Sequence, residues 1–373
     1  MVYAMFSIGI LGFLVWSRLP DFGSVILVAS PYCEIWLNNP AICWDGLVLL
    51  NTLNCKNFNS YTKSAGNSKL IGNASETTHG SSFNFDAFNR LLTKSGKKPI
   101  SANWLEWFIG FTEGDGAIFS DKNISRIRFI LTQKESDVLY HIQETFGFGT
   151  VRHFNPNKAT KLRPKVDNNN GFYRWVVEDF NSLVLLANLF NGNLAINHRN
   201  EQLDYWIKYI NNKLPNSIVH NKEVVNITLN DAWLSGFTDA EGCFNVSVST
   251  NSRYATGFVI KIRFLLDQNS EFILYKIRNL FGFGSVKLRS ETKKTYRYDS
   301  TGYNNMIEIC EYFDKFPLRS KKAKSISKWT TILKMVINKQ HLTSEGLETI
   351  KMLKKEININ NSLTIKTDTS LAK

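Results

Sequence analysis

Two stretches of the chain combine apolar and small residues at helical spacing. Residues 104–119 read WLEWFIGFTEGDGAIF, and residues 233–246 read WLSGFTDAEGCFNV. Gly110 and Gly114 lie four positions apart in the first stretch, as do Gly236 and Ala240 in the second, so each pair falls on one face of a helix. A helix face without bulky side chains lets another backbone approach closely. The pattern therefore predicts two helices that pack against each other.

Each of these patterns ends in a carboxylate, Asp115 in the first and Glu241 in the second. The glycine that follows each acid is suited to the left-handed turn that ends many helices. We therefore expect the two carboxylates side by side at helix C-termini, where the last carbonyls also carry partial negative charge. A hard cation such as Mg²⁺ relieves this repulsion, and metal-bound carboxylates are suited to hydrolysing phosphodiesters. For one copy alone, an ordinary helix-ending turn is the simpler interpretation, but two copies favour a functional site.

Beyond each acid the pattern alternates apolar and polar residues, which indicates half-buried strands. Residues 127–151 align without a gap to residues 262–286 with 13 identities in 25 positions, so the chain contains a duplication. Each copy predicts a helix, a small antiparallel sheet and covering helices, which is an α+β unit. The strands are offset by 135 residues and the acids by 126, so the second copy has nine extra residues within 247–261, which predict a longer hairpin.

The predicted strands of both copies carry cations in corresponding places. A single strand with alternating arginines is usually a solvated sheet face, but the recurrence favours one basic surface that binds duplex DNA through phosphates and base edges. The residues expected to bind DNA are Arg126, Arg128, Arg152, Arg174, Lys261, Arg263, Lys287, Arg289 and Arg297.

The net charge agrees with a polyanionic partner. The 373 residues include 45 Lys and Arg against 32 Asp and Glu, a formal charge of +13. Five cysteines without a CxxC spacing support neither a disulfide framework nor a structural zinc site.

The remaining segments divide the chain. We expect an apolar segment at 1–17, a low-complexity or linker region at 18–97, a first repeat at 98–211, a linker at 212–230, a second repeat at 231–356 and a polar tail at 357–373. Asn103 with Glu106 is suited to capping the first motif helix. Residues 1–17 carry no charge and are slightly short for a membrane span, so they are expected to form either a membrane-helix fragment or a buried helix.

FIGFTEGDG (108–116) and LSGFTDAEG (234–242) resemble the two signature motifs of single-chain LAGLIDADG homing endonucleases. The resemblance covers residues 100–356 and implies a monomer with pseudo-twofold symmetry that cleaves both strands of a long DNA site. It implies that Asp115 and Glu241 bind metal, with the carbonyls of Gly114 and Ala240 adding oxygen ligands. Gln133 and Gln268 match the family's polar position that orders water near the scissile phosphates.

Lys321 matches the peripheral lysine of the family, which activates water or stabilises developing charge. Without the resemblance it is equally well a solvated lysine at a helix end. In the first repeat Asn197 stands where that lysine is expected, followed by His198 and Arg199. The two half-sites are therefore expected to be chemically unequal, which permits a nicking preference.

MVYAMFSIGILGFLVW at the N-terminus resembles a transmembrane stretch of cytochrome c oxidase subunit 1. This implies a reading frame fused to an upstream exon, within a group I intron of mitochondria, and an N-terminal segment associated with membrane before processing. An RNA-binding maturase that assists splicing of its own intron is the alternative function, separately or in addition. A membrane protein anchored by residues 1–17 is a third interpretation, which leaves the duplication without a role.

Overall fold

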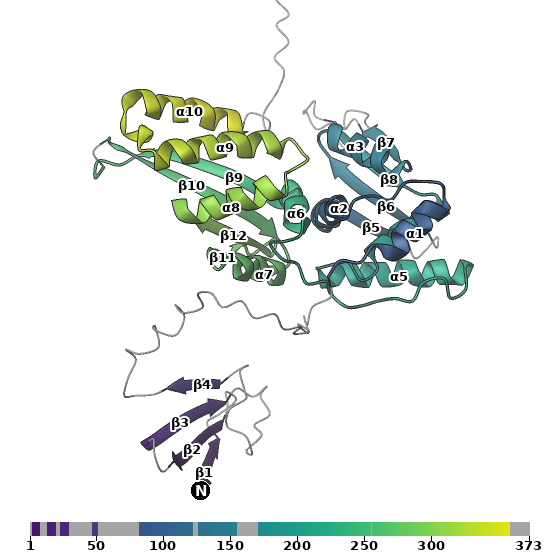
Figure 1. Ribbon diagram of the computed structural model, residues 1–373, viewed down its shortest axis with the longest axis horizontal. Helices are drawn as coiled ribbons and strands as arrows, with labels where there is room; N and C mark the ends of the chain where they lie inside the picture. The colour runs from purple at the N-terminus through teal and green to yellow at the C-terminus, as the bar shows by residue number, and fades with distance from the viewer. Residues whose placement is uncertain are drawn as a thin grey trace, which may run out of the picture. The chain divides into compact units, whose positions relative to one another are not determined.

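The computed structural model of the chain describes residues 82–121, 126–154, 171–254 and 256–358, and the backbone of four strands nearer the N-terminus (Figure 1). The chain divides into two compact units, Met1–Thr77 and Thr78–Lys373.

The N-terminal unit contains an antiparallel sheet in the order β1-β2-β3-β4. Its strands are β1 (Val2–Ser7), β2 (Phe13–Leu19), β3 (Gly23–Ala29) and β4 (Leu47–Leu50). The prediction of a helix over residues 1–17 is therefore wrong. The β-branched and aromatic residues of this segment favour extended backbone. Within the described part of the chain, no helix is both long and apolar enough to cross a membrane.

The second unit contains the two repeats. The elements of the first are α1 (Asp86–Lys94), α2 (Ala102–Asp115), β5 (Gly116–Asp121), β6 (Arg126–Gln133), α3 (Asp137–Phe146), β7 (Thr150–Phe154), β8 (Phe172–Val177), α4 (Phe180–Phe190) and α5 (Asn197–Lys213). The elements of the second are α6 (Trp233–Glu241), β9 (Gly242–Thr250), β10 (Phe258–Gln268), α7 (Glu271–Phe281), β11 (Ser285–Ser290), β12 (Thr295–Thr301), α8 (Tyr303–Lys315), α9 (Lys322–Ile337), η3 (Gln340–Leu342) and α10 (Ser344–Asn358).

The two repeats have the same topology. Their antiparallel sheets run in the orders β5-β6-β8-β7 and β9-β10-β12-β11, so corresponding strands occupy corresponding places. Each motif helix leads directly into the first strand of its sheet. The predicted α+β architecture of two pseudo-symmetric units is confirmed, and so is the longer hairpin, because β9 and β10 have 9 and 11 residues against 6 and 8 in β5 and β6.

The motif helices α2 and α6 pack side by side between the two sheets (Figure 1). A Cβ atom at Gly110 would lie 2.0 Å from the carbonyl oxygen of Trp233, and one at Gly236 would lie 1.7 Å from that of Trp107. Only glycine fits at these two crossing points, because each is occupied by the partner helix's backbone. The predicted close approach of the two helices is confirmed.

The glycines that follow the acids have a different role from the predicted one. Gly116 and Gly242 are extended, with φ of −80° and −79°, and each begins a strand. A Cβ at Gly116 would lie 2.6 Å from the Thr112 carbonyl oxygen, and one at Gly242 would lie 2.4 Å from Cγ2 of Thr238. The expected left-handed turn is therefore wrong, and glycine is needed here for space.

Two of the segments predicted as linkers contain residues that pack against the repeats. The helix α1 lies within the expected linker 18–97, yet Phe85, Phe88 and Leu92 are buried in the core of the first repeat. Within the expected linker 212–230, Val225 and Ile227 are buried, and the Val225 N–H donates to the Leu194 carbonyl. Both segments are polar on average. Their composition therefore does not reveal the few apolar residues that pack them against the repeat.

Candidate active site

The two motif acids end the two packed helices. Asp115 is the last residue of α2 and Glu241 the last residue of α6, so the predicted placement at helix C-termini is confirmed. Gln133 Nε2 donates to Asp115 Oδ2 over 2.6 Å, and Gln268 Nε2 lies 3.3 Å from Glu241 Oε1. Each glutamine ends one of the two central strands of its own sheet, β6 or β10. The structure therefore brings together four of the five residues expected to take part in catalysis.

Each carboxylate makes ionisation of the other less favourable. Burial raises the pKa of Glu241 to about 7, and the neighbouring charge of Asp115 contributes in the same direction. The pKa of Asp115 is also raised by burial, against the hydrogen bond from Gln133 and the charges of Lys322 and Arg199. Within the described residues, no three His, Cys, Asp or Glu side chains gather as a metal site. Two half-buried carboxylates that repel fit a hard cation whose shell is completed by other oxygens.

Metal affinity should consequently depend on pH. A pKa of about 7 favours the protonated form of Glu241 below that pH, so a cation held by this carboxylate would have to displace the proton. Apparent Ca²⁺ or Mg²⁺ affinity is therefore expected to fall roughly tenfold for each pH unit below 7, and to level off above it. Calorimetric titrations between pH 5.5 and 8.5 measure this. In Glu241→Gln the dependence should largely disappear; an equally steep slope in that variant would contradict the assignment of the proton to Glu241.

Two partly buried cations reach the ends of the motif helices, and sequence reasoning assigned neither a role. Lys322 Nζ donates to the carbonyls of Thr238 at 3.0 Å and Ala240 at 2.9 Å. In the first repeat, Arg199 Nη2 donates to the carbonyls of Glu113 at 3.0 Å and Gly114 at 3.4 Å. Both cations offset the negative charge of the acids and of the helix ends.

Both half-sites place a cation at the end of the motif helix, but one is an arginine and the other a lysine, so the expected chemical inequality stays a prediction. Asn197 begins α5, and the neighbouring Arg199 reaches the end of α2 as Lys322 reaches the end of α6. Lys321, the lysine predicted from the resemblance, forms instead an ion pair with Glu135 of the other repeat. The predicted roles of Lys321 and of the Gly114 and Ala240 carbonyls stay predictions, and these two carbonyls already accept hydrogen bonds from cations.

A second pair of motif acids, Glu113 and Asp239, stabilises the fold. Glu113 accepts hydrogen bonds from the N–H groups of Ala195 and Ile196, at 2.9 and 2.7 Å, and from the Trp233 indole of the opposite helix at 2.6 Å. Asp239 likewise accepts from the Arg319 N–H at 2.7 Å and from the Trp107 indole at 2.8 Å. Each acid thus fixes the segment that leads to the cation at the end of its repeat's motif helix, and links the two motif helices.

Glu106 also takes a different role from the predicted one. Its carboxylate accepts from the N–H of Ala232, just before α6, at 2.9 Å. Asn103 lies inside α2, which begins at Ala102, and Ser101 at its N-cap makes no side-chain capping bond. The expected capping by Asn103 and Glu106 is therefore wrong, and Glu106 stabilises the start of the opposite motif helix.

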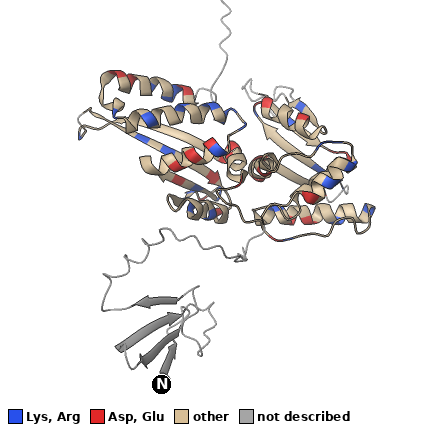
Figure 2. Cartoon of the chain, viewed as in Figure 1, with Lys and Arg blue, Asp and Glu red and all other residues tan. Residues whose placement is uncertain are grey.

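The cations predicted to bind DNA share one face of each sheet, because Arg152 is the cross-strand partner of Arg174, and Lys287 that of Arg297. In β6 and β10 the cations alternate with buried residues that face the core. Several are held by carboxylates, so the surface is less uniformly basic than expected, and Figure 2 shows both signs of charge on the strands of the second repeat. The ion pairs are Arg126 and Arg152 with Glu178, Arg289 and Arg297 with Asp267, and Arg263 with Asp299.

The remaining predicted cations have other surroundings. The Arg128 guanidinium lies 4.6 Å from the centroid of the Phe119 ring, and that of Arg174 lies 4.9 and 5.0 Å from the centroids of Phe154 and Phe172. Lys261 and Lys287 are exposed. Arginines stacked on rings keep their donor edges available for a ligand.

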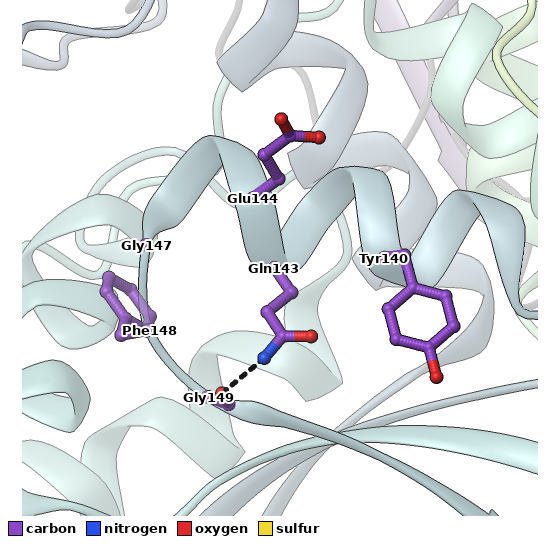
Figure 3. A pocket seen from close by; sticks show the side chains of 6 residues that line it. All are labelled: Tyr140, Gln143, Glu144, Gly147, Phe148 and Gly149. Carbon is purple, nitrogen blue, oxygen red and sulfur yellow. Dashed lines mark hydrogen bonds between the residues drawn. The ribbon is translucent and has the colours of Figure 1, made fainter.

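A hollow of about 480 Å³ lies elsewhere in the first repeat, at α3 and the turn that follows it (Figure 3). It is lined by Tyr140, Gln143, Glu144, Gly147, Phe148 and Gly149, and Gln143 donates to the Gly149 carbonyl at 3.1 Å. It contains neither motif acid. The paired carboxylates lie instead at the ends of α2 and α6.

Comparison with known proteins agrees with this geometry. Residues 234–333, which contain the second motif, match the family model described as LAGLIDADG endonuclease. "Probable intron-encoded endonuclease 4" of Neurospora crassa is 35% identical over 270 residues, which cover 69% of this chain and 45% of that protein. "Uncharacterized cox1 intron-2 37.2 kDa protein" of Schizosaccharomyces pombe is 26% identical over 263 residues, covering 70% of this chain and 74% of that protein. The chain thus spans less than half of the first relative and about three quarters of the second.

Solved structures show the same fold. The LAGLIDADG meganuclease I-AabMI bound to uncleaved DNA is similar with a TM-score of 0.54 at 21% identity, over 67% of this chain and 98% of that one. I-SmaMI bound to an uncleaved DNA target in the presence of calcium ions is similar with a TM-score of 0.51 at 17% identity, over 68% of this chain and 98% of that one. The second unit of this chain therefore has the LAGLIDADG meganuclease fold.

Proposed function

We propose that the chain is a site-specific homing endonuclease that hydrolyses one phosphodiester in each strand of a long DNA target. The observation that carries the proposal is the pairing of Asp115 and Glu241 at the ends of two helices that separate two sheets with cationic faces. Duplex DNA placed across both sheets would bring its two strands near the two carboxylates. The relatives named as intron-encoded endonucleases support this function.

We propose Mg²⁺ as the cation, held by Asp115 and Glu241. Carboxylate, water and phosphate oxygens are the ligands that Mg²⁺ prefers. When bound, the ion polarises the scissile phosphate and lowers the pKa of water. The structural neighbour I-SmaMI was bound to its uncleaved DNA target in the presence of calcium ions, which supports a site for hard divalent ions in this fold.

The residues around the acids then have distinct roles. Gln133 and Gln268 hold the carboxylates by hydrogen bonds and orient water at the edge of the site. Lys322 and Arg199 offset negative charge when phosphate joins the two acids. The cations of the two sheets bind phosphates and base edges and fix the register of the DNA.

Lys322→Met should lower the cleavage rate about 100-fold, because it removes a preorganised positive charge beside the acids. Lys321→Met is the matched control and should leave the rate within about threefold, since Lys321 is engaged by Glu135. Single-turnover cleavage on saturating DNA measures both. A large loss in Lys321→Met with none in Lys322→Met would restore the assignment made from the sequence resemblance.

We further propose that the chain is encoded in a group I intron of a mitochondrial cytochrome c oxidase subunit 1 gene and acts in mitochondria. The similarity to a cox1 intron protein and the exon-like N-terminus support this origin. The target is then the intron-free junction of that gene. A supercoiled plasmid with the junction should become linear in Mg²⁺ and remain supercoiled with chelator. Intact plasmid, combined with tight binding of the intron RNA, would instead support the maturase.

A further inference from the structure

The ladder between β9 and β10 continues beyond the last described pair of its counterpart, the β5–β6 ladder. In the first repeat the last described pair of the β5–β6 ladder is Asp121 with Arg126, which corresponds to Ser247 with Lys261 in the second. The second repeat continues with three further pairs, Val248 with Ile260, Ser249 with Val259, and Thr250 with Phe258. At about 3.3 Å per residue, the described β9–β10 ladder is roughly 10 Å longer than the described β5–β6 ladder.

The extra length continues the open face of the sheet. In β9, Asn245, Ser247 and Ser249 alternate with the apolar residues Phe244, Val246 and Val248, which pack toward the core. Ser249 therefore shares a face with Ser247, and Ser249 is exposed. On β10 the same face carries Lys261 and Arg263. In the extension itself this face carries Ser249 and its cross-strand partner Val259, so it offers a hydroxyl for phosphates or base edges and an apolar group for contacts such as the thymine methyl.

The other face of this hairpin is supported by the C-terminal helices. α10 packs against both β9 and α9 (Figure 1), with Ile350 buried. Lys351 Nζ lies 4.6 Å from the centroid of the Phe258 ring, near the hairpin's end. Lys328 of α9 and Glu356 of α10 form an ion pair of 2.5 Å. The extension is thus backed by packed helices along its apolar side and can meet a ligand without first being ordered.

We propose that the extended β9–β10 hairpin is an arm that contacts the outer end of the DNA half-site bound by the second repeat. An additional 10 Å corresponds to about three base pairs at 3.4 Å per step. Protein contacts therefore reach about three base pairs further from the cut on this side than on the other. The inference rests on the proposed function, because it takes the open sheet faces as the DNA surface.

The test begins with the full chain in Ca²⁺ and pools of randomised duplexes, from which a bound sequence is selected. Base pairs are then removed one at a time from each end. Affinity should begin to fall about three base pairs further from the centre at one end than at the other. Selection of no sequence would contradict both the proposed function and the arm, whereas equal reach at both ends would overturn the arm alone.

A matched pair of variants assigns the longer end to the hairpin. Ser249→Glu places a carboxylate on the open face of the arm and should weaken binding of the full duplex roughly fivefold to tenfold. Ser327→Glu makes the same charge change at an exposed position of α9 and should have little effect. On a duplex trimmed by three base pairs at the longer end, Ser249→Glu and the unsubstituted chain should bind equally. A loss of the same size on both duplexes would show that the arm does not contact that flank.

Discussion

Asp115→Asn or Glu241→Gln should reduce double-strand cleavage at least about a thousandfold, while DNA binding persists. Each substitution preserves the shape of the side chain but removes one of the two negative charges available to the metal, and loss of one preorganised electrostatic group costs about this much. Binding should be unchanged or slightly tighter, because a negative charge facing the phosphates is removed. Cleavage rates and filter binding on the same duplex separate the two effects.

Glu348→Gln is a suitable control, because this carboxylate lies on α10 and its side chain is 66% exposed. It makes the same chemical change as Glu241→Gln and should cleave normally. Cleavage by Asp115→Asn or Glu241→Gln at the rate of the control would contradict the metal assignment. Simultaneous loss of binding and cleavage would instead show that the substitution disturbs the packing of α2 and α6.

Gly236→Val should lower the free energy of unfolding by at least about 3 kcal/mol, the upper part of the range for overpacked sites. A Cβ atom here would lie 1.7 Å from the carbonyl oxygen of Trp107, which belongs to the opposite helix backbone and cannot rotate away as a side chain does. Because α2 and α6 also position the acids, cleavage should be lost as the helices separate.

Urea unfolding of the full chain, followed by circular dichroism, measures this effect. Ser327→Val introduces the same side chain at an exposed position of a helix and should cost only a few tenths of a kcal/mol. If Gly236→Val were as mild as this control, the two motif helices could not be packed as closely as the structure shows.

The architecture could be predicted from the sequence because the duplication repeats the same pattern of helix and strand residues. The small residues of each motif predicted the close helix pair, and the aligned segments predicted corresponding strands. Even the longer hairpin followed from the nine-residue difference in spacing. These features depend on local period and on steric exclusion, both of which are visible in the chain itself.

Roles that depend on orientation could not be predicted in the same way. Glu113 and Asp115 have the same chemistry two positions apart, but two residues along a helix turn the side chain by about 200°. Glu113 therefore enters the core, where Trp233 and the Ala195 N–H are its partners. The sequence feature that could have indicated this structural role is the recurrence of an acid at the equivalent position of the second repeat, Asp239.

Adjacent lysines illustrate the same limit. Lys321 and Lys322 differ by one position, yet one pairs with Glu135 on the opposite repeat and the other reaches the carbonyls that end α6. Their partners lie far away in the sequence, so only the folded arrangement distinguishes them. The carboxylates that hold the sheet arginines, such as Asp267, were missed for the same reason.

Anomalous scattering from crystals of the full chain with its DNA target and Mn²⁺ tests the metal assignment most directly. Mn²⁺ prefers oxygen ligands as Mg²⁺ does and can be located by its anomalous signal. We expect metal at the ends of α2 and α6, coordinated by Asp115 and Glu241 and in contact with phosphate oxygens of the DNA. Crystals with bound DNA and no metal at these carboxylates, or with metal only elsewhere, would contradict the assignment.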